Sequence, residues 1–387
     1  MYVSIHFRTV SGGFRPAPGP TVGGGEFPAP PHKRFFDRRE SPRFSVHLNV
    51  FLARGAVAPA PEVPLVQTTV VGSYPRVSNG PEGQRLRKAI AMWERQEISR
   101  EDLRRVQVDV LHEVVAEQAA VGVDLVTDGN ITWYDPLSHF AAKMDGLQVG
   151  ALERYFDTNT YYRRPQRVGP VHWRGPMTVE DYSAAAAASA APAKAVLTGP
   201  YTLAALSADG ASEELVMEFA EALMHEVKAL AAAGAPHIQI NEPALVLRTD
   251  LPRGYNHIAG LVLRGKGNAK TTLFTYFGGV GPLLDDLLML PFDVLGLDLV
   301  QGASTLRALA ATDVEKGLAF GLVDARNTKL EDPKAVAKAV LAFEDRVPLD
   351  RSYLAPSNGL EFLPRARARE KLEVLVTAAK LVGEATT

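Results

Sequence analysis

The chain has 387 residues, 46% of them hydrophobic and 22% charged, with a formal net charge of −2 at pH 7. This composition is typical of a globular protein with a large core, and the near-neutral charge gives no electrostatic case for nucleic acid or a membrane surface as partner. The absence of cysteine excludes disulfides, cysteine nucleophiles and thiolate metal ligands. No apolar run approaches the ~20 residues of a membrane span and no signal peptide is visible, so we expect a cytoplasmic protein.

Residues 1–66 differ in composition from the rest of the chain. They are rich in Pro, Gly and Arg, with segments such as RPAPGP and no sustained periodicity, although HLNVFLA from His47 is a candidate for a short strand. Such a sequence buries too little apolar surface to offset chain entropy, so we expect a disordered extension. A basic interaction arm and a translation start assigned too far upstream are the alternatives.

Residues 67–387 contain eight short apolar runs, nearly all of which end in polar, glycine or proline residues. The runs begin at Thr68, Asp124, Ala195, His237, Thr271, Val294, Leu318 and Ser352. Segments rich in Ala and Leu, with helical spacing, fill most of the gaps between them. Eight strands alternating with helices predict a single-domain (β/α)8 TIM barrel, whose active site forms at the carboxyl ends of the strands.

Two of the predicted helices carry clear boundary signals. One begins after the N-cap Ser99 and ends at Gly122, and another repeats this design from Ser212 to Gly234. Further helices are expected from Ser183 to Pro192, from Asp332 and from Ala366. The last of these would close the barrel behind the eighth strand.

Polar residues after the fourth and second runs are the sharpest candidates for a site. Asn241 and Glu242 end the fourth run, and a carboxylate beside an amide could hold an ammonium group or act as a general base, unless Glu242 pairs with a neighbouring Arg. Asp128 and Asn130 end the second run, and Trp133 follows them. An aromatic ring beside a carboxylate suits a flat ligand, but a loop that folds back on the barrel rim is an equal alternative.

Other strand ends add further candidates. The turn Gly72-Ser73 could bind a carboxylate through its amides and hydroxyl, although Gly-Ser turns are common. Asp324 and Arg326 point to the same side of the seventh strand, where they could clamp an anion or form an ordinary salt bridge. The remaining strand-end side chains are Tyr276, Asp298 and Asn358.

Two basic clusters surround an aromatic-rich loop. Arg85, Arg87 and Lys88 lie in GQRLRKAIAMWE, and Arg154, Arg163 and Arg164 flank the loop in RYFDTNTYYRRP. Together they would attract a polyanionic ligand, although a solvated helix face explains each cluster singly. The nine histidines show no metal-binding spacing, so a metal site is not expected.

Several long motifs resemble the cobalamin-independent methionine synthase family, from Thr68 to Leu381. They are WYDP from Trp133, RYFDTNTYYRRP from Arg154, IQINEPALVL from Ile238, TYFGGV from Thr275, GLDLVQG from Gly296 and GLVDARN from Gly321. The family contains two related barrels, and these motifs are closest to the N-terminal one. GSYPR at Gly72 and LVTDGN at Leu125 are more similar to the single-domain and C-terminal versions.

The resemblance implies a zinc site that this chain cannot complete. In the family's C-terminal barrel, one His, one Glu and two Cys bind the zinc that activates the homocysteine thiol. The corresponding segments here are 274–278, a position near Asp298, and 355–359, and they contain no Cys or His. Zinc is thus expected for the family, but its thiolate ligands are missing.

The resemblance also implies ligand roles. It assigns the amino-acid part of homocysteine to Gly72-Ser73, Asp128 and Asn241-Glu242, although Asn241 replaces the expected Asp. It places the basic residues Arg85, Arg87 and Arg154 at or beside the positions that bind the polyglutamate tail of methyl-folate.

The sequence therefore predicts a protein of methyl transfer from methyl-folate, or another donor, to homocysteine. We expect the folate-side barrel, working with a separately encoded zinc-bearing barrel. One alternative is a metal-free enzyme of the same fold that acts on a different small-molecule substrate, with catalytic candidates Asp128, Glu242 and Asp324 and with Tyr276 and Arg326 as electrophilic helpers. The other is a non-catalytic binding subunit.

Overall fold

The computed structural model describes residues 65–78, 80 and 82–386. The expected N-terminal extension and its candidate strand at His47 therefore lie outside the described residues, apart from Leu65 and Val66.

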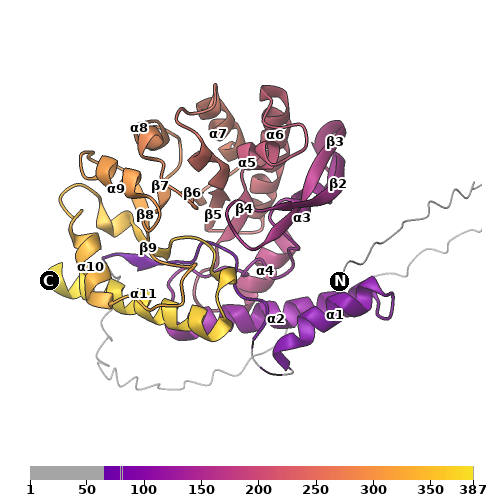
Figure 1. Cartoon of the computed structure of the whole chain (residues 1–387), viewed down its shortest axis with the longest axis horizontal. Coiled ribbons are helices and arrows are strands. Elements are labelled where there is room, and N and C mark those ends of the chain that lie inside the picture. Colours follow the sequence, from indigo (N-terminus) through magenta and orange to yellow (C-terminus); the bar gives the residue numbers. More distant parts are fainter. Residues whose placement is uncertain (1–64, 79, 81, 387) are drawn as a thin grey trace, which may run out of the picture. The chain divides into compact units, whose positions relative to one another are not determined.

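A curved parallel sheet forms the centre of the described part of the chain (Figure 1). Its strand order is β1-β9-β8-β7-β6-β5-β4, and every neighbouring pair is parallel. The bounds are β1 (Gln67–Thr68), β4 (Ala195–Thr198), β5 (His237–Asn241), β6 (Lys270–Thr275), β7 (Val294–Asp298), β8 (Gly317–Val323) and β9 (Tyr353–Pro356). The second predicted run joins β1 to β4 through the bridges Thr69–Leu125 and Val126–Ala193. Seven of the eight predicted runs thus form strands, the second contributes only isolated bridges, and the TIM-barrel-like fold is confirmed.

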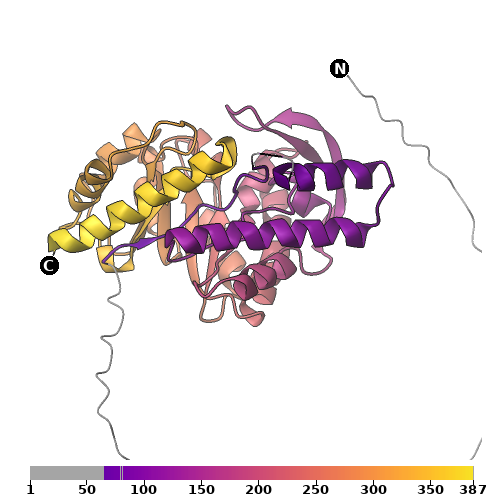
Figure 2. The same cartoon turned by 90° about the horizontal axis from the view of Figure 1, so that it is seen from below.

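Helices cover the outside of this barrel. They are α1 (Arg85–Glu94), α2 (Arg100–Val121), α3 (Ser138–Ala141), α4 (Val179–Ala188), α5 (Pro200–Ala205), α6 (Glu213–Ala232), α7 (Tyr255–Leu263), α8 (Leu284–Leu288), α9 (Ala303–Leu309), α10 (Pro333–Leu341) and α11 (Arg365–Thr386). Figure 2 shows α2 and α11 side by side, and α11 also contacts β9 and β1, as expected for a closing helix. No described helix combines the length and apolarity needed to cross a membrane.

The predicted helix boundaries follow from capping. Ser99 Oγ accepts a hydrogen bond from Asp102 N, the Asp102 carboxylate accepts one from Ser99 N, and Gly122 is left-handed with φ +97°. Ser212 Oγ accepts a hydrogen bond from Leu215 N at the start of α6. Both N-caps are confirmed, because each hydroxyl satisfies one of the N–H groups that a helix start leaves free.

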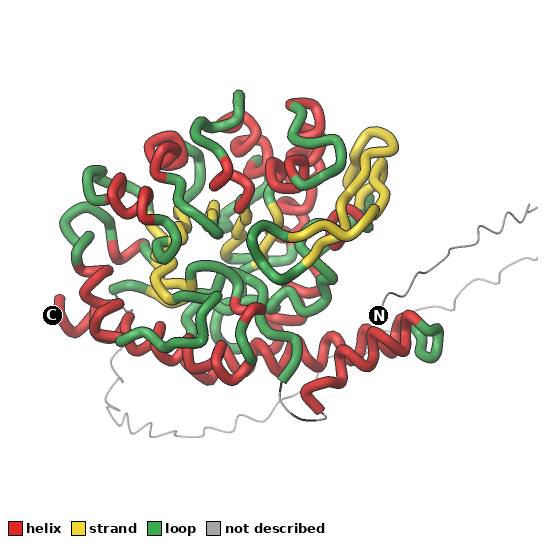
Figure 3. Tube along the Cα trace, viewed as in Figure 1, coloured by secondary structure: helices red, strands yellow, loops and turns green. Residues whose placement is uncertain are grey.

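One structural element was not predicted. Residues expected to form an aromatic-rich loop lie instead at the end of an antiparallel hairpin, β2 (Met144–Arg154) and β3 (Tyr161–Trp173), which Figure 3 shows to one side of the barrel strands. The loop expectation is correct only for the tip, where Tyr155 N donates to Thr160 O at 3.0 Å. The hairpin carries residues 155–160 toward the strand ends.

A buried carboxylate on α6 anchors this hairpin. Glu226 is 0% exposed and accepts hydrogen bonds from Trp173 Nε1 (2.9 Å), Met177 N (2.9 Å), Thr178 N (2.7 Å) and Thr178 Oγ1 (2.9 Å). Burying a carboxylate costs free energy unless donors surround it, and here the end of β3 and the segment after it supply them.

Glu226→Ala should therefore destabilise the protein by roughly 2–5 kcal/mol, because it leaves several buried donors unsatisfied. Urea unfolding followed by circular dichroism measures the change in the free energy of unfolding. Glu221→Ala, at an exposed position of the same helix, is the matched control and should change it by less than about 0.5 kcal/mol. Equal effects of the two variants would contradict the anchoring role.

Candidate active site at the barrel mouth

The ends of the first two strands form one hydrogen-bonded cluster. The Asn130 side chain is satisfied with its Oδ1 accepting from Ser73 Oγ (3.0 Å) and Ser73 N (3.3 Å) and its Nδ2 donating to Asp128 Oδ1 (3.3 Å). Asn130 N also donates to Asp128 Oδ1 at 3.1 Å, and Thr127 Oγ1 donates to Gly72 O at 3.0 Å. The predicted residues Gly72, Ser73, Asp128 and Asn130 are therefore brought together.

Asp128 is buried with a perturbed carboxyl group. Burial, and then the negative charge of Asp181, raise the pKa of Asp128 to about 7, while Arg104 acts in the opposite direction. The side chain is only 7% exposed. A carboxyl group with this pKa can exchange a proton at neutral pH, which suits an acid or base role.

Glu242 is placed differently from the expectation. It is 0% exposed, and its oxygens accept hydrogen bonds from Tyr201 N (3.0 Å), Thr202 N (2.7 Å), Thr202 Oγ1 (2.6 Å) and Tyr255 Oη (2.7 Å). A Cβ at Gly199 would lie 2.2 Å from Glu242 Cδ, so only glycine fits there. In the described part of the chain Glu242 forms no ion pair with an Arg. The carboxylate holds the start of α5, and a catalytic role for it stays a prediction that this geometry does not favour.

Asn241 presents a fixed orientation to the mouth. Gln239 Nε2 donates to Asn241 Oδ1 (2.7 Å) and to Val71 O (2.6 Å), while Gln239 Oε1 accepts from Lys194 Nζ (2.6 Å). A carbonyl oxygen can only accept, so Val71 fixes the Gln239 amide, and that amide fixes Asn241. The acceptor of Asn241 is therefore used inside the barrel, and its donor side faces Tyr276, where it helps to offset the rise in pKa that burial gives Tyr276.

The hairpin tip lies over the strand ends on aromatic contacts. The ring of Phe277, after β6, is 5.3 Å from that of Phe156 and 5.8 Å from that of Tyr155, between ring centroids. The Arg326 guanidinium lies 5.7 Å from the centroid of the Phe277 ring and donates to Asp157 O. These contacts connect the loop after β8 to the hairpin tip.

The predicted pair Asp324 and Arg326 does not form a salt bridge between side chains in the described structure. Asp324 Oδ1 accepts instead from the backbone Arg326 N at 2.8 Å. The Arg326 guanidinium is thereby directed to the hairpin tip and to Gln301 Oε1, which lies 3.4 Å from Nη1. Anion clamping by these two residues stays a prediction.

Buried polar atoms without partners gather near the same strand ends. Among the described residues, three such atoms belong to this region, namely Trp133 Nε1, Asn358 Oδ1 and Glu361 Oε2, while the Tyr155 hydroxyl interacts with that of Tyr276. Burial, and then the nearby phenol of Tyr276, raise the pKa of Tyr155. Native proteins rarely leave buried polar groups unsatisfied, so this concentration indicates a place for a polar ligand.

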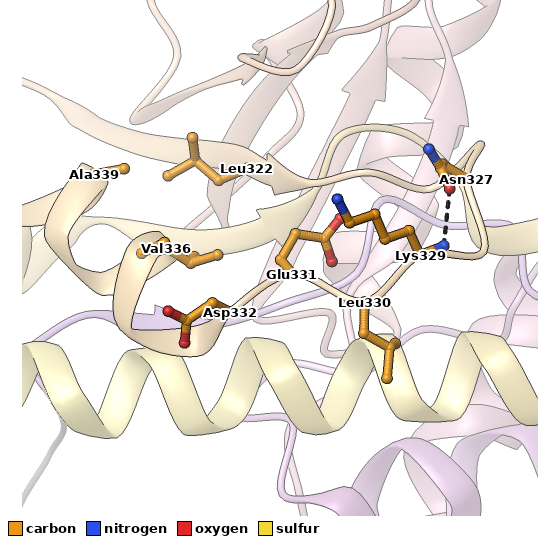
Figure 4. Close-up of a pocket in the computed structure, with 9 residues that line it drawn as sticks. Leu322, Asn327, Lys329, Leu330, Glu331, Asp332, Val336 and Ala339 are labelled. Carbon is orange, nitrogen blue, oxygen red and sulfur yellow. Dashed lines mark hydrogen bonds between the residues drawn. The ribbon is translucent and has the colours of Figure 1, made fainter.

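A separate open cavity of about 560 Å³ lies between α10 and the loop after β8 (Figure 4). Its lining residues are Leu322, Asn327, Lys329, Leu330, Glu331, Asp332, Ala335, Val336 and Ala339. Asn327 Oδ1 accepts from Lys329 N at 2.8 Å, and Glu331 pairs with the buried Lys371 at 2.7 Å. None of the strand-end cluster lines this cavity, which is open and largely apolar.

Known proteins are similar to this chain in sequence. A sequence model described as "Cobalamin-independent synthase, Catalytic domain" matches residues 66–381. The protein named methionine synthase of Saccharolobus solfataricus is 32% identical over 333 residues, which cover 84% of this chain and 96% of that relative. The chain belongs to the cobalamin-independent methionine synthase family. The matching sequence model is described as the catalytic domain, whereas the motifs are closest to the N-terminal barrel.

Solved structures agree on the fold of this family member. A B12-independent methionine synthase from Shewanella sp. W3-18-1, in complex with selenomethionine, has a TM-score of 0.71 at 22% identity and covers 84% of this chain and 99% of that chain. A putative vitamin-B12-independent methionine synthase from Listeria monocytogenes has a TM-score of 0.64 at 18% identity. At these identities the likeness shows a shared fold.

The zinc expected for the family does not fit the side chains present here. Asp298 is 1% exposed and accepts hydrogen bonds from Phe277 N, Val300 N and Gln301 N, between 2.9 and 3.1 Å. Burial raises the pKa of Asp298 to about 6. Across residues 65–78, 80 and 82–386, no group of three His, Asp or Glu side chains could hold a metal ion.

The predicted basic residues differ in availability. Arg85 pairs with Glu113 at 2.8 Å, and Arg154 donates to Thr158 O at 2.7 Å and pairs with Asp157 at 3.3 Å. Arg87 and Lys88 are exposed on α1, and no hydrogen bond or ion pair of theirs occurs within the described structure. These two are therefore the side chains best placed for an external polyanion.

Two residues of this region were missed in the sequence. Arg76 ends the GSYPR motif after β1 and Glu361 follows β9, but the sequence analysis assigns no chemical role to either residue. The available signal was their position in loops that follow strand ends, where this fold places its site.

Asp128→Asn should change how stability depends on pH. The folded wild type keeps the Asp128 proton up to about pH 7, whereas the unfolded chain loses it near pH ~4, so this group makes wild-type stability fall as pH rises between these values. The variant lacks this term, and its free energy of unfolding relative to wild type should rise by roughly 1–3 kcal/mol from pH 5 to pH 8. Urea unfolding at several pH values measures this. The exposed Asp109→Asn is the control, and parallel curves for wild type and Asp128→Asn would exclude the raised pKa.

Arg326→Ala should loosen the hairpin tip, because it removes the contact with Phe277 and the bond to Asp157 O. Amide hydrogen exchange across residues 155–160 should become about 10-fold faster, or roughly 1.4 kcal/mol in local opening free energy. The exposed Arg264→Ala, at the end of α7, serves as the control. Unchanged exchange in Arg326→Ala would show that the tip is held without this residue.

Proposed function

We propose that this chain binds a homocysteine-like amino acid in the barrel mouth and takes part in the methylation of its sulfur. Family membership supports this, as does the coverage of 96% of a relative named methionine synthase. The observation that carries the proposal is the cluster of Ser73, Asp128 and Asn130 beside buried polar atoms that lack partners. A ligand with a carboxylate and an ammonium group would supply the missing hydrogen bonds.

The reaction requires a thiolate. The sulfur attacks the methyl carbon, the bond between that carbon and the donor breaks, and the donor keeps the electron pair, while the thiol proton must already have left. Since the zinc set does not fit this chain, we place thiol activation on a separately encoded, Cys-bearing barrel. In this arrangement the present chain supplies binding and positioning of substrates.

A metal-free reaction is the second candidate, and a specific feature favours it. The pKa of Asp128 lies at about 7 because the carboxyl group is buried beside Asp181. A carboxylate with this pKa could accept the proton of a homocysteine thiol held in the same cluster. The chain would then act alone.

For the methyl donor we propose methyl-folate with a polyglutamate tail. Arg87 and Lys88 are exposed and have no ion-pair partner among the described residues, which favours a ligand with several carboxylates. Arg85 and Arg154 already have acidic neighbours and contribute less to this attraction.

The test combines binding with turnover on the full chain. Calorimetry should detect L-homocysteine and L-methionine binding, and methionine formation from methyl-folate triglutamate should require an added Cys-bearing barrel. Turnover by the chain alone would establish the metal-free route instead. Binding with no turnover under either condition would leave a binding subunit, and absence of binding would contradict the proposal.

Donor recognition has its own test. Replacement of Arg87 and Lys88 by Gln should raise the KM for the triglutamate donor by about 3- to 10-fold, with kcat unchanged, because the lost contacts are to its charged tail. The KM for the monoglutamate donor should not change. Lys338→Gln, an exposed residue of α10, is the control. Equal changes for both donors would exclude tail binding at α1.

A further inference from the structure

We infer that Arg76 and Glu361 form a clamp for the amino-acid substrate, with Arg76 on its carboxylate and Glu361 on its ammonium group. The inference rests on the proposed amino-acid substrate and identifies two residues that hold it. Neither is among the positions that the family resemblance assigns.

Both residues come from loops that meet at the strand-end cluster. Leu360 N donates to Ser73 O at 2.8 Å, which ties the turn containing Glu361 to the turn after β1. Arg76 Nη2 lies 3.4 Å from Asn130 O. Glu361 raises the pKa of both Tyr155 and Tyr276, and among the charged groups it has the largest effect on the pKa of Arg76. The clamp therefore lies beside Ser73 and Asn130, under the hairpin tip.

Most hydrogen-bond donors of Arg76 are unused in the described structure. A guanidinium carries five N–H donors, and the long contact with Asn130 O is its only hydrogen bond in the described structure. Burial lowers its pKa, and the charges of Glu361, Asp135 and Asp128 oppose that change, yet among the described residues no carboxylate lies within 4.0 Å of the guanidinium to form an ion pair. A partly buried Arg in this state is suited to a ligand carboxylate, which can accept two parallel hydrogen bonds.

Glu361 has an unused hydrogen-bond acceptor. Its Oε2 is buried and has no hydrogen-bond partner, and among the described residues no cation forms an ion pair with it. Burial raises the pKa of Glu361 to about 7, and only Arg76 counteracts this electrostatically. A cationic ligand group would satisfy Oε2 and stabilise the ionised carboxylate.

The other acceptors near the mouth explain why Glu361 is needed. An ammonium group has three donors. Asn241 Oδ1 is used by Gln239, and the Glu242 oxygens accept four hydrogen bonds within the protein. Asn241 stands where the family has an Asp, which removes one acceptor for the ammonium group. Together with Asp128, Glu361 provides a free acceptor in its place.

A neighbouring glycine fixes where the Glu361 carboxylate lies. A Cβ at Gly359 would lie 2.1 Å from Glu361 Oε2 and 2.9 Å from its Cδ. Gly359→Ala must therefore displace the carboxylate while leaving its charge in the chain. This variant separates the position of the carboxylate from its presence.

The experiment compares three ligands by calorimetry on the full chain: L-methionine, its deamino analogue (methylsulfanyl butanoate) and its decarboxylated analogue (methylsulfanyl propylamine). Glu361→Gln and Gly359→Ala should weaken L-methionine binding by about 10- to 100-fold and leave the deamino analogue within twofold. Arg76→Gln should weaken L-methionine by a similar factor and leave the decarboxylated analogue within twofold.

Different outcomes would contradict the clamp and the proposed amino-acid substrate. Glu344→Gln, at an exposed position in the turn after α10, should bind all ligands as wild type does, and thermal unfolding checks that each variant is folded. L-methionine binding by wild type with an unchanged Glu361→Gln variant, or equal losses for methionine and the deamino analogue, would overturn the clamp alone. No methionine binding by wild type would overturn both the clamp and the proposed function.

Discussion

The site depends on one buried hydrogen-bond chain inside the barrel. Lys194 is 2% exposed, and burial lowers its pKa to about 7, so its ammonium group needs a strong acceptor. Gln239 supplies that acceptor, and its amide donors bind Val71 O, after β1, and Asn241 Oδ1 at the end of β5. Lys194 can only donate and Val71 O can only accept, so the Gln239 amide has one orientation. Through this amide, the charge of Lys194 determines which atoms Asn241 presents to a ligand.

The same logic separates structural from ligand-binding carboxylates. Glu226 and Glu242 are both 0% exposed, but each accepts several hydrogen bonds from the protein and so holds an element in place. Glu361 has a buried oxygen without a partner. Burial by itself therefore does not identify a functional carboxylate, whereas burial with unused hydrogen-bonding capacity does.

Much of the fold could be predicted because its signals are local. A buried parallel strand is a short apolar run, and caps such as Ser99 and Gly122 mark helix ends. The hairpin was missed because its alternation is broken by register shifts near Gly146 and Gly150. The positions of the strand ends predicted that Ser73 and Asn130 lie together. The hydrogen bonds that occupy the Glu242 carboxylate come from α5 and α7, and no local sequence pattern indicates such distant partners.

The departure from the family's zinc chemistry goes beyond two missing thiolates. The carboxylate at the position nearest the expected Glu ligand, Asp298, is occupied by three backbone N–H groups, and the neighbouring Tyr276 and Phe277 belong to the aromatic cover of the mouth. Two cysteines introduced at segments 274–278 and 355–359 would still meet a carboxylate already committed to the backbone. The strand ends of this chain are thus organised as a hydrogen-bonding site for a polar ligand, with Asn358 Oδ1 and Glu361 Oε2 as its unused acceptors.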